Sequence, residues 1–165
     1  MSMIIQSGRF GLDNTYIGPA PIGNEVAARA WRLYGLKGQG NNPQYGEIQL
    51  KHTVGGTNQA SLGTGLGTAF SGSYLPANAF DNNLSTVWAA NAFVRQWVGL
   101  DFGAGNKMVL REVVMQQSPS FPTERWHSVL VQYSQDLITW HDYCLPVNAL
   151  DLASTMALTG DQTFT

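Results

Sequence analysis

The chain has 165 residues and a formal net charge of −2; 44% of its residues are hydrophobic, but only 12% are charged. This length and composition suit one domain with its own core plus a short appendage. Without a basic run, nucleic acid is a poor candidate partner, and no apolar stretch has the length that membrane insertion requires.

Residues 1–24 are expected to form an extended N-terminal arm outside the core. Residues 18–21, Gly-Pro-Ala-Pro, favour an extended or polyproline conformation. An extra strand packed on the domain remains an open alternative. The segment lacks the basic-then-apolar pattern of a secretory signal, so no signal peptide is predicted. As an arm, it should anchor itself on a neighbouring subunit or a particle through its apolar residues. These are Ile4, Ile5, Phe10, Tyr16 and Ile17.

Residues 25–165 are predicted to form one β-rich domain, since low charge with many Gly, Ser, Thr and Asn is typical of an all-β sandwich. Alternating apolar residues predict a first strand pair within 28–54. Residues 55–76, rich in glycine, are predicted to be mostly loop. The strongest helical run, at 25–30, is short. Further strands are expected at 97–102, 108–116 (with a possible bulge), 129–133, 138–143 and, at an edge, 162–164.

The most informative stretch runs from residue 79 to residue 103. Asp81-Asn82-Asn83 predicts a tight turn, because Asp and Asn side chains bond their own nearby backbone. Trp88 follows, and residues 97–102 then alternate as a half-buried strand would. An acidic turn against tryptophans is costly unless a cation or hydrogen-bond donors lie beside it.

This stretch resembles the discoidin domains, also called coagulation-factor C-type domains, and the carbohydrate-binding modules built on the same jelly roll. The resemblance implies an all-β fold: a jelly-roll β-sandwich of the galactose-binding-domain-like type. Three elements carry it in the family's order: the turn at 81–83 with Thr86-Val87-Trp88, the strand Trp97-Val98-Gly99-Leu100-Asp101-Phe102-Gly103, and the motif Tyr133-Ser134-Gln135-Asp136-Leu137-Ile138-Thr139-Trp140.

The first strand pair resembles the closing strands of the same family, moved to the front of the chain. Residues 28–33, Ala-Arg-Ala-Trp-Arg-Leu, and residues 46–48, Gly-Glu-Ile, are similar to strands that usually end a discoidin domain. We interpret this order as a circular permutation, which sandwiches tolerate because their termini often lie close together.

The resemblance also implies a structural calcium ion at the polar turn. Calcium takes roughly six to eight oxygen ligands. The alternative is that Asp81 and Glu47 only cap turns. The expected ligands are the carboxylates of Asp81 and, after permutation, Glu47, the Thr86 hydroxyl, and backbone oxygens around Phe80 and Asn83.

Sugar binding is the family's common activity, and it uses aromatic faces and hydrogen bonders on the loops at the cation end. The alternative for Phe93 and Trp126 is that they close the ends of the sandwich. The residues available for a glycan are Tyr74, Phe93, Arg95, Phe121, Arg125, Trp126 and His127.

No enzyme activity is predicted, because no carboxylate pair, activated nucleophile or metalloenzyme cluster is recognisable. Cys144, the single cysteine, is expected to be a small core residue. Permuted single domains with a glycine-rich polar surface resemble bacteriophage virion proteins. The chain is therefore expected in the virion as a decoration or attachment protein of capsid, tail or fibre, contacting other virion proteins and its own copies. The alternative hypothesis is a carbohydrate-binding module for host cell-surface glycan.

Overall fold

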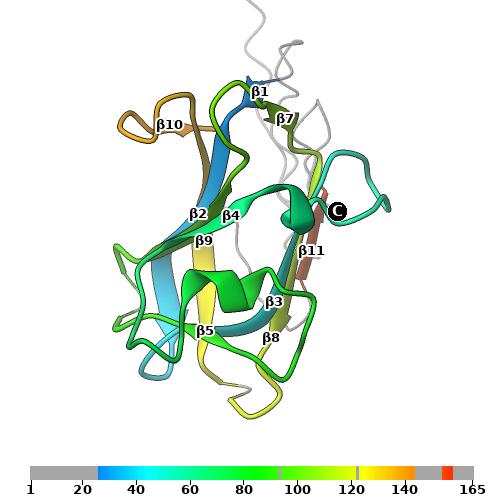
Figure 1. Ribbon diagram of the computed structural model, residues 1–165. Coiled ribbons are helices and arrows are strands. Elements are labelled where there is room, and N and C mark those ends of the chain that lie inside the picture. The colour runs from blue at the N-terminus through cyan, green and yellow to red at the C-terminus, as the bar shows by residue number, and fades with distance from the viewer. Residues whose placement is uncertain (1–25, 93, 122, 144–153, 158–165) are drawn as a thin grey trace, which may run out of the picture.

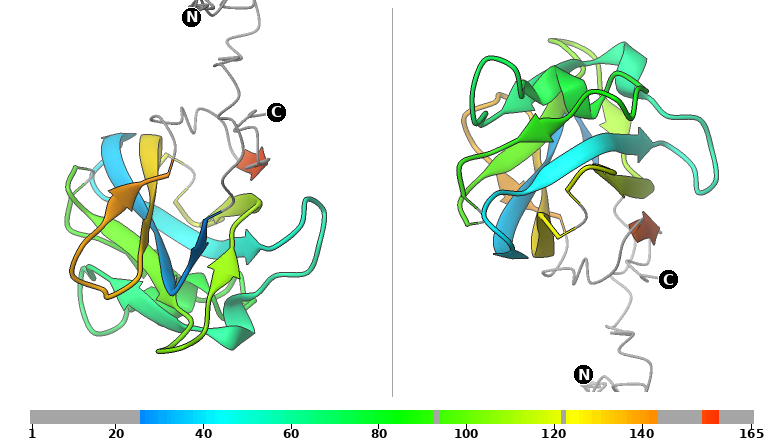
Figure 2. Two further views of the ribbon diagram at one scale, coloured as in Figure 1. Left: turned by 90° about the horizontal axis from the view of Figure 1, so that it is seen from above. Right: turned by 90° about the horizontal axis from the view of Figure 1, so that it is seen from below.

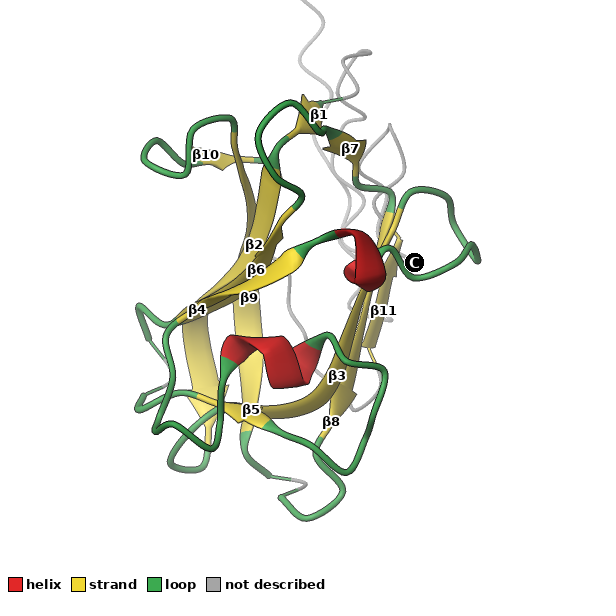
Figure 3. Cartoon of the chain, viewed as in Figure 1, coloured by secondary structure: helices red, strands yellow, loops and turns green. Residues whose placement is uncertain are grey.

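The computed structural model describes residues 26–92, 94–121, 123–143 and 154–157. Within these residues the all-β expectation is confirmed: the chain folds as an antiparallel sandwich with two short 3-10 helices (Figure 1, Figure 3). Strand β1 spans Ala27–Ala28, β2 Ala30–Gln39, β3 Gln44–Lys51, β4 Thr64–Gly67, β5 Trp88–Ala89, β6 Trp97–Asp101, β7 Met108–Val109, β8 Glu112–Gln117, β9 Arg125–Ser134, β10 His141–Asp142 and β11 Ser154–Ala157. The helices are η1 (Ala60–Leu62) and η2 (Pro76–Ala79).

Two sheets face each other across the core. One has the strand order β10-β9-β2-β6-β4, and the other has the order β11-β8-β3-β5. The short strands β1 and β7 form a separate pair at one end. The edge strands β10 and β11 lie on opposite sides of the molecule (Figure 2).

The two strands expected within 28–54 are present as β2 and β3. They do not pair with each other but lie in the interior of opposite sheets. Strand β2 lies between β9 and β6, and its pairing with β9 runs from Ala30↔Ser134 to Gln39↔Arg125. Strand β3 lies between β8 and β5. The helical run expected at residues 25–30 is wrong, because this segment holds β1 and the start of β2. Residues 26–51 are therefore integral to the sandwich.

Three tryptophans form the centre of the core. Trp31, Trp88 and Trp126 are each fully buried. A buried indole N–H needs an acceptor, and Trp31 donates to the carbonyl of Met108 at 2.8 Å while Trp88 donates to that of Thr68 at 2.7 Å. Apolar side chains from both sheets, such as Leu33, Ile48, Leu50, Val98, Leu100, Val113, Met115, Val129 and Val131, complete the core.

Helix η1 and strand β4 lie within residues 55–76, where the sequence predicted mostly loop, and helix η2 follows this segment. A Cβ at Gly65 would lie 2.8 Å from the backbone of Ala77, and one at Gly67 would lie 2.5 Å from the carbonyl of Trp97. These glycines therefore let β4 pass close to η2 and to β6. A strand composed of Thr-Gly-Leu-Gly carries no alternation, so its pairing is visible only in three dimensions.

The last third of the chain differs from the expected strands in three places. The stretch 108–116 is divided into β7 and β8, and the irregularity of the β3–β8 pair lies at Tyr45/Glu47 on β3. The strand expected at 138–143 is reduced to β10. Strand β11, which pairs with β8, was not expected. The expected edge strand at 162–164, the arm at 1–24 and Cys144 lie outside the described residues.

Within the described residues, no helix has the length and apolar character needed to cross a membrane.

Candidate functional site

The polar turn after η2 is built by its own side chains. Asp81 accepts the backbone N–H of Asn83 at 3.0 Å, and Asn83 accepts that of Ser85 at 3.0 Å. The Thr86 hydroxyl lies 2.6 Å from an Asp81 carboxylate oxygen and 2.7 Å from the carbonyl of Asn83. Asn82 has a φ of 58°, a left-handed conformation that Asn tolerates better than most residues. An Asp81 carboxylate oxygen, the Asn83 carbonyl oxygen and the Thr86 hydroxyl oxygen thus lie close together.

Glu47 of β3 reaches this turn from the opposite direction. Its side chain is almost fully buried, accepts the backbone N–H of Asn82 at 2.8 Å, and accepts the Asn58 amide at 3.2 Å. Burial raises the pKa of the Glu47 carboxyl to about 7, and the neighbouring Asp81 carboxylate also raises it. The structure therefore brings together Glu47, Asp81, Asn83 and Thr86, as the resemblance implied, and Phe80 is buried directly before them.

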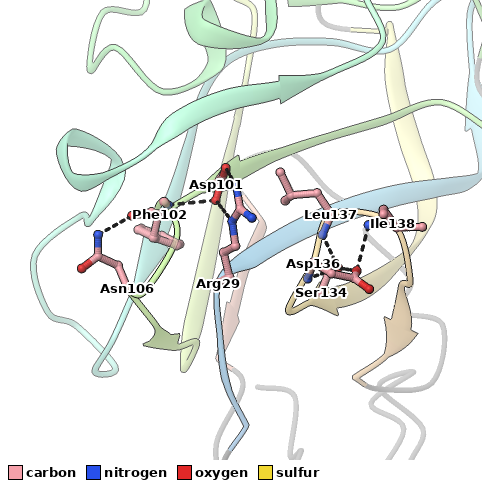
Figure 4. Close-up of polar contacts among 9 residues, drawn as sticks. Arg29, Asp101, Phe102, Asn106, Ser134, Asp136, Leu137 and Ile138 are labelled. Carbon is pink, nitrogen blue, oxygen red and sulfur yellow. Dashed lines mark hydrogen bonds and ion pairs between the residues drawn. The ribbon is translucent and has the colours of Figure 1, made fainter.

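The motifs at residues 97–103 and 133–140 organise the turns that directly follow β6 and β9 (Figure 4). Asp101 forms a two-point ion pair with Arg29, at 2.8 and 2.7 Å, and accepts the N–H of Gly103. The Arg29 hydrogen bonds lower the pKa of Asp101. Asp136 accepts the backbone N–H groups of Thr139 and Ile138, which lower its pKa to about 2. Both aspartates therefore act as turn builders.

Three loops meet at the end of the sandwich where β9 begins. Gln44 donates its backbone N–H to the carbonyl of Glu124, and Ser118 donates to that of Gln44. The backbone N–H of Ala90 donates to the carbonyl of Pro43, and this hydrogen bond joins the loop before β6 to the same end. We call this region the loop end.

At the loop end, the assignment of Trp126 to glycan binding is wrong. Its ring has no exposed surface and packs on Trp88 and Tyr45, with ring centroids 5.2 and 5.6 Å away. The Tyr45 hydroxyl also accepts the backbone N–H of Trp126 at 3.0 Å. Trp126 therefore closes this end of the core, which was the alternative for this residue.

The other candidates for glycan contact are divided among several segments. Phe121 is 41% exposed, and half-buried Arg125 and His127 follow it at the start of β9, where His127 lies 3.0 Å from the Gln39 side-chain oxygen. Arg95 is exposed in the loop before β6, and Tyr74 packs its ring on Phe70 in a different loop. Phe93 lies outside the described residues.

The loop end also holds polar atoms that the sequence did not single out. The side-chain oxygens of Gln44, Gln117 and Ser118 are buried and have no hydrogen-bond partner among the described residues. Each such atom costs about 1–3 kcal/mol unless something bonds to it. A water molecule or a ligand hydroxyl at this position would satisfy them.

A pocket of about 440 Å³ lies near β7. It is lined by His52, Gln59, Leu62, Phe102, Asn106, Lys107, Met108 and Val109. This lining contains no carboxylate and no Ser, Thr or Cys nucleophile. It therefore lacks the side-chain pairs that most hydrolytic chemistry uses.

Comparison with known protein families agrees with this geometry. The family model "F5/8 type C domain" matches residues 59–160, which is more than half of the chain. The chain belongs to the F5/8 type C, or discoidin, family. No curated protein and no solved structure matches the chain. The chain is thus a discoidin-like binding module, and the match begins after β3, so strands β1 to β3 of this discoidin domain precede it.

The turn of this discoidin domain fits a hard cation by the chemistry of its donors. Glu47 and Asp81 are neighbouring carboxylates, and neither forms an ion pair with a cationic side chain in the described part of the chain. The Asn83 carbonyl and the Thr86 hydroxyl add neutral oxygens, which suit calcium. No group of three or more His, Cys, Asp or Glu side chains that could hold a metal is found among the described residues, so a cation here would depend on neutral oxygens as well.

Proposed function

We propose that the chain is a non-catalytic bacteriophage virion component, a decoration or attachment protein of capsid, tail or fibre built on a circularly permuted discoidin module. The order of the strands carries the proposal. Strands β2 and β3, which resemble the closing strands of the family, precede the matched region and yet lie at the centre of both sheets. The low charge and many glycines of the chain suit a protein that remains part of a particle.

In this proposal, residues 1–24 attach the domain to other virion proteins or to its own copies, and the protein is located in the virion. The support is chemical. The segment carries apolar side chains that would be a liability in water, and its Gly-Pro-Ala-Pro stretch suits a semi-rigid spacer.

The test of this function is the protein composition of purified particles. Mass spectrometry of gradient-purified phage particles should find the chain in a fixed ratio to the major structural proteins. A chain lacking residues 1–24 should fold, as circular dichroism would show, but should stay in the unbound fraction when mixed with particles that lack the protein. Particles without the chain would overturn the proposal, and normal attachment of the shortened chain would place the contacts on the sandwich.

We also propose that the turn holds a structural calcium ion, with Glu47, Asp81, Thr86 and the backbone oxygens near Phe80 and Asn83 as ligands. The ion would join β3 to the turn after η2. Its support is the buried carboxylate of Glu47, whose hydrogen-bond donors are amides and whose near neighbour is a second carboxylate.

Without calcium, the stability of the protein should fall as the pH rises through about 7. The pKa of Glu47 is raised in the folded state. The stability that the protonated Glu47 carboxyl contributes is therefore complete below the ordinary pKa of a glutamate, and it is lost as the buried carboxyl ionises. Calcium binds the ionised form, so the melting temperature should rise by roughly 5–10 °C at pH 8 with saturating calcium, and by much less at pH 5.

Thermal melts with calcium chloride or EDTA at both pH values measure this effect. Glu47→Gln should remove most of the calcium response, whereas Asp142→Asn, which alters an exposed carboxylate on β10, should retain it. A wild-type melting temperature that does not respond to calcium at pH 8 would refute the cation site.

The second candidate function is a carbohydrate-binding module for host surface glycan. One observation favours it: the loop end combines buried unpartnered oxygens of Gln44 and Ser118 with an exposed ring, Phe121. A sugar stacked on that ring would place hydroxyl groups near polar atoms that need partners.

A further inference from the structure

The outer face of the five-stranded sheet carries a cation among aromatic rings. The guanidinium carbon of Arg32 lies 4.1 Å from the ring centroid of Trp140, 5.0 Å from that of Trp97 and 5.4 Å from that of Tyr34. The two indoles contact each other, with centroids 5.7 Å apart. All four side chains are half-buried and lie outside the hydrophobic core. We call this group the sheet platform.

A chain of hydrogen bonds across three strands holds the cation in place. Arg32 of β2 donates its Nε–H to the side-chain oxygen of Gln132 on β9 at 2.7 Å. Gln132 in turn donates its amide to Asp142 on β10 at 2.6 Å. Both pairs follow the strand register, in which Arg32 lies opposite Gln132 and Gln132 opposite Asp142. The guanidinium is therefore fixed before any ligand binds.

The neighbouring strand β6 approaches Arg32 closely on its other side. Its partner in register on β6 is Gly99, where a Cβ would lie 2.7 Å from the Cβ of Arg32 and 2.2 Å from the carbonyl of Trp31. Only glycine fits this close approach. Gly99 therefore lets β6 lie close to β2, and Trp97, two residues earlier on β6, lies against the Arg32 guanidinium.

Part of the guanidinium remains available to a ligand. Among the described residues, its two terminal nitrogens have no hydrogen-bond acceptor, and no carboxylate lies within ion-pair distance of Arg32. The Asp142 carboxylate, whose charge acts on Arg32 from beyond ion-pair distance, accepts a hydrogen bond from Gln132 instead. An arginine held among aromatic faces without a carboxylate partner is suited to bind one from outside.

We propose that the sheet platform binds a carboxylated sugar of a glycan, in addition to any ligand of the loop end. The C–H face of the sugar ring would stack on Trp97 and Trp140, and its carboxylate would accept hydrogen bonds from Arg32. The proposal rests on the proposed binding function, because it names a ligand class and a second surface for the same module.

Intrinsic tryptophan fluorescence can report this binding selectively. Of the five tryptophans, Trp31, Trp88 and Trp126 have no exposed surface, so a ligand at the surface can act directly only on the two in the platform. The full chain is titrated with oligouronates and, separately, with neutral gluco-oligosaccharides of equal length. The oligouronates should change the emission and bind at least about tenfold more tightly, a difference that one charged hydrogen-bonded pair supplies.

Four variants separate the platform from the loop end. Trp140→Ala should weaken oligouronate binding about tenfold, and Arg32→Gln should remove the preference over neutral sugars. Arg32→Lys keeps the charge but loses the planar pair of donors, so it should restore the preference only in part. Phe121→Ala, an exposed aromatic substitution at the loop end, should leave oligouronate binding unchanged. Isothermal titration measures each affinity, and thermal melts check that each variant is folded.

Several results would overturn the inference. If Phe121→Ala abolishes binding while Trp140→Ala does not, glycan binds at the loop end only. If wild type does not bind oligouronates, the platform has another role, while attachment to particles, measured separately, can still hold. If Trp140→Ala converts a self-associated protein into a monomer by analytical ultracentrifugation and no sugar binds, the platform is a contact between copies.

Discussion

A chain that begins at residue 52 should fail to fold, although it keeps the whole region that the family model matches. Removing β2 would separate β9 from β6, and removing β3 would separate β8 from β5. The loss includes Trp31, Leu33, Ile48 and Leu50, all at most 2% exposed. Each such apolar side chain contributes about 1.5–3 kcal/mol by burial, so their sum alone is comparable with the total stability of a domain.

Far-ultraviolet circular dichroism and proton NMR dispersion measure this result. The matched control is a chain that begins at residue 26, which keeps every strand of the described sandwich and should fold cooperatively. If the shorter chain also folds cooperatively, strands β2 and β3 are an appendage, and the interpretation of permuted closing strands is wrong.

Trp126→Ala should destabilise the protein by roughly 3–5 kcal/mol, because it removes a large ring from a filled core. The ring contacts Trp88 and Tyr45 and has no exposed surface, so the cavity would lie at the centre of the aromatic cluster. Since the free energy of unfolding of such domains is only about 5–15 kcal/mol, the variant should be only marginally stable at 37 °C.

Urea denaturation followed by circular dichroism measures this change. Trp126→Phe should cost less, because it leaves a smaller cavity. Trp140→Ala is the matched control from the outer face and should shift the midpoint only slightly, since Trp140 lies outside the core. An unchanged midpoint for Trp126→Ala would mean that the ring is not a core residue and would return it to the candidates for glycan contact.

Much of the sandwich could be predicted from the sequence because its central strands alternate. Strands β2, β3 and β9 each bury every second residue over part of their length, and in β6 the apolar side chains of Val98 and Leu100 flank Gly99, so the period of two survives in the amino-acid order. Strand β4 could not be predicted, because its glycines are required by neighbours in space. The expected strand at 138–143 is shortened because Ser134 and Asp136 accept the backbone N–H groups that a ladder would use.

The candidate sites also divide into those that local sequence predicts and those that depend on contacts in three dimensions. The turn at 81–86 is local, so the short polar side chains predict it, and only the family resemblance linked it to Glu47. Trp126 was misassigned because an aromatic residue after a loop can point into the core or into solvent, and the sheet register decides. The sheet platform was missed because Arg32 and Trp140 meet only through the pairing of β2, β9 and β10.

Both proposed sites depend on the first strand pair, since Glu47 lies on β3 and Arg32 on β2. The most direct test is native-state hydrogen exchange of the intact protein, read by NMR or mass spectrometry. We expect the amides of β2 and β3 to exchange as slowly as those of β6, β8 and β9, because all of them should open only when the sandwich unfolds. Fast exchange throughout residues 30–51, with residues 97–134 still protected, would show that the first strand pair is detachable and would contradict the account.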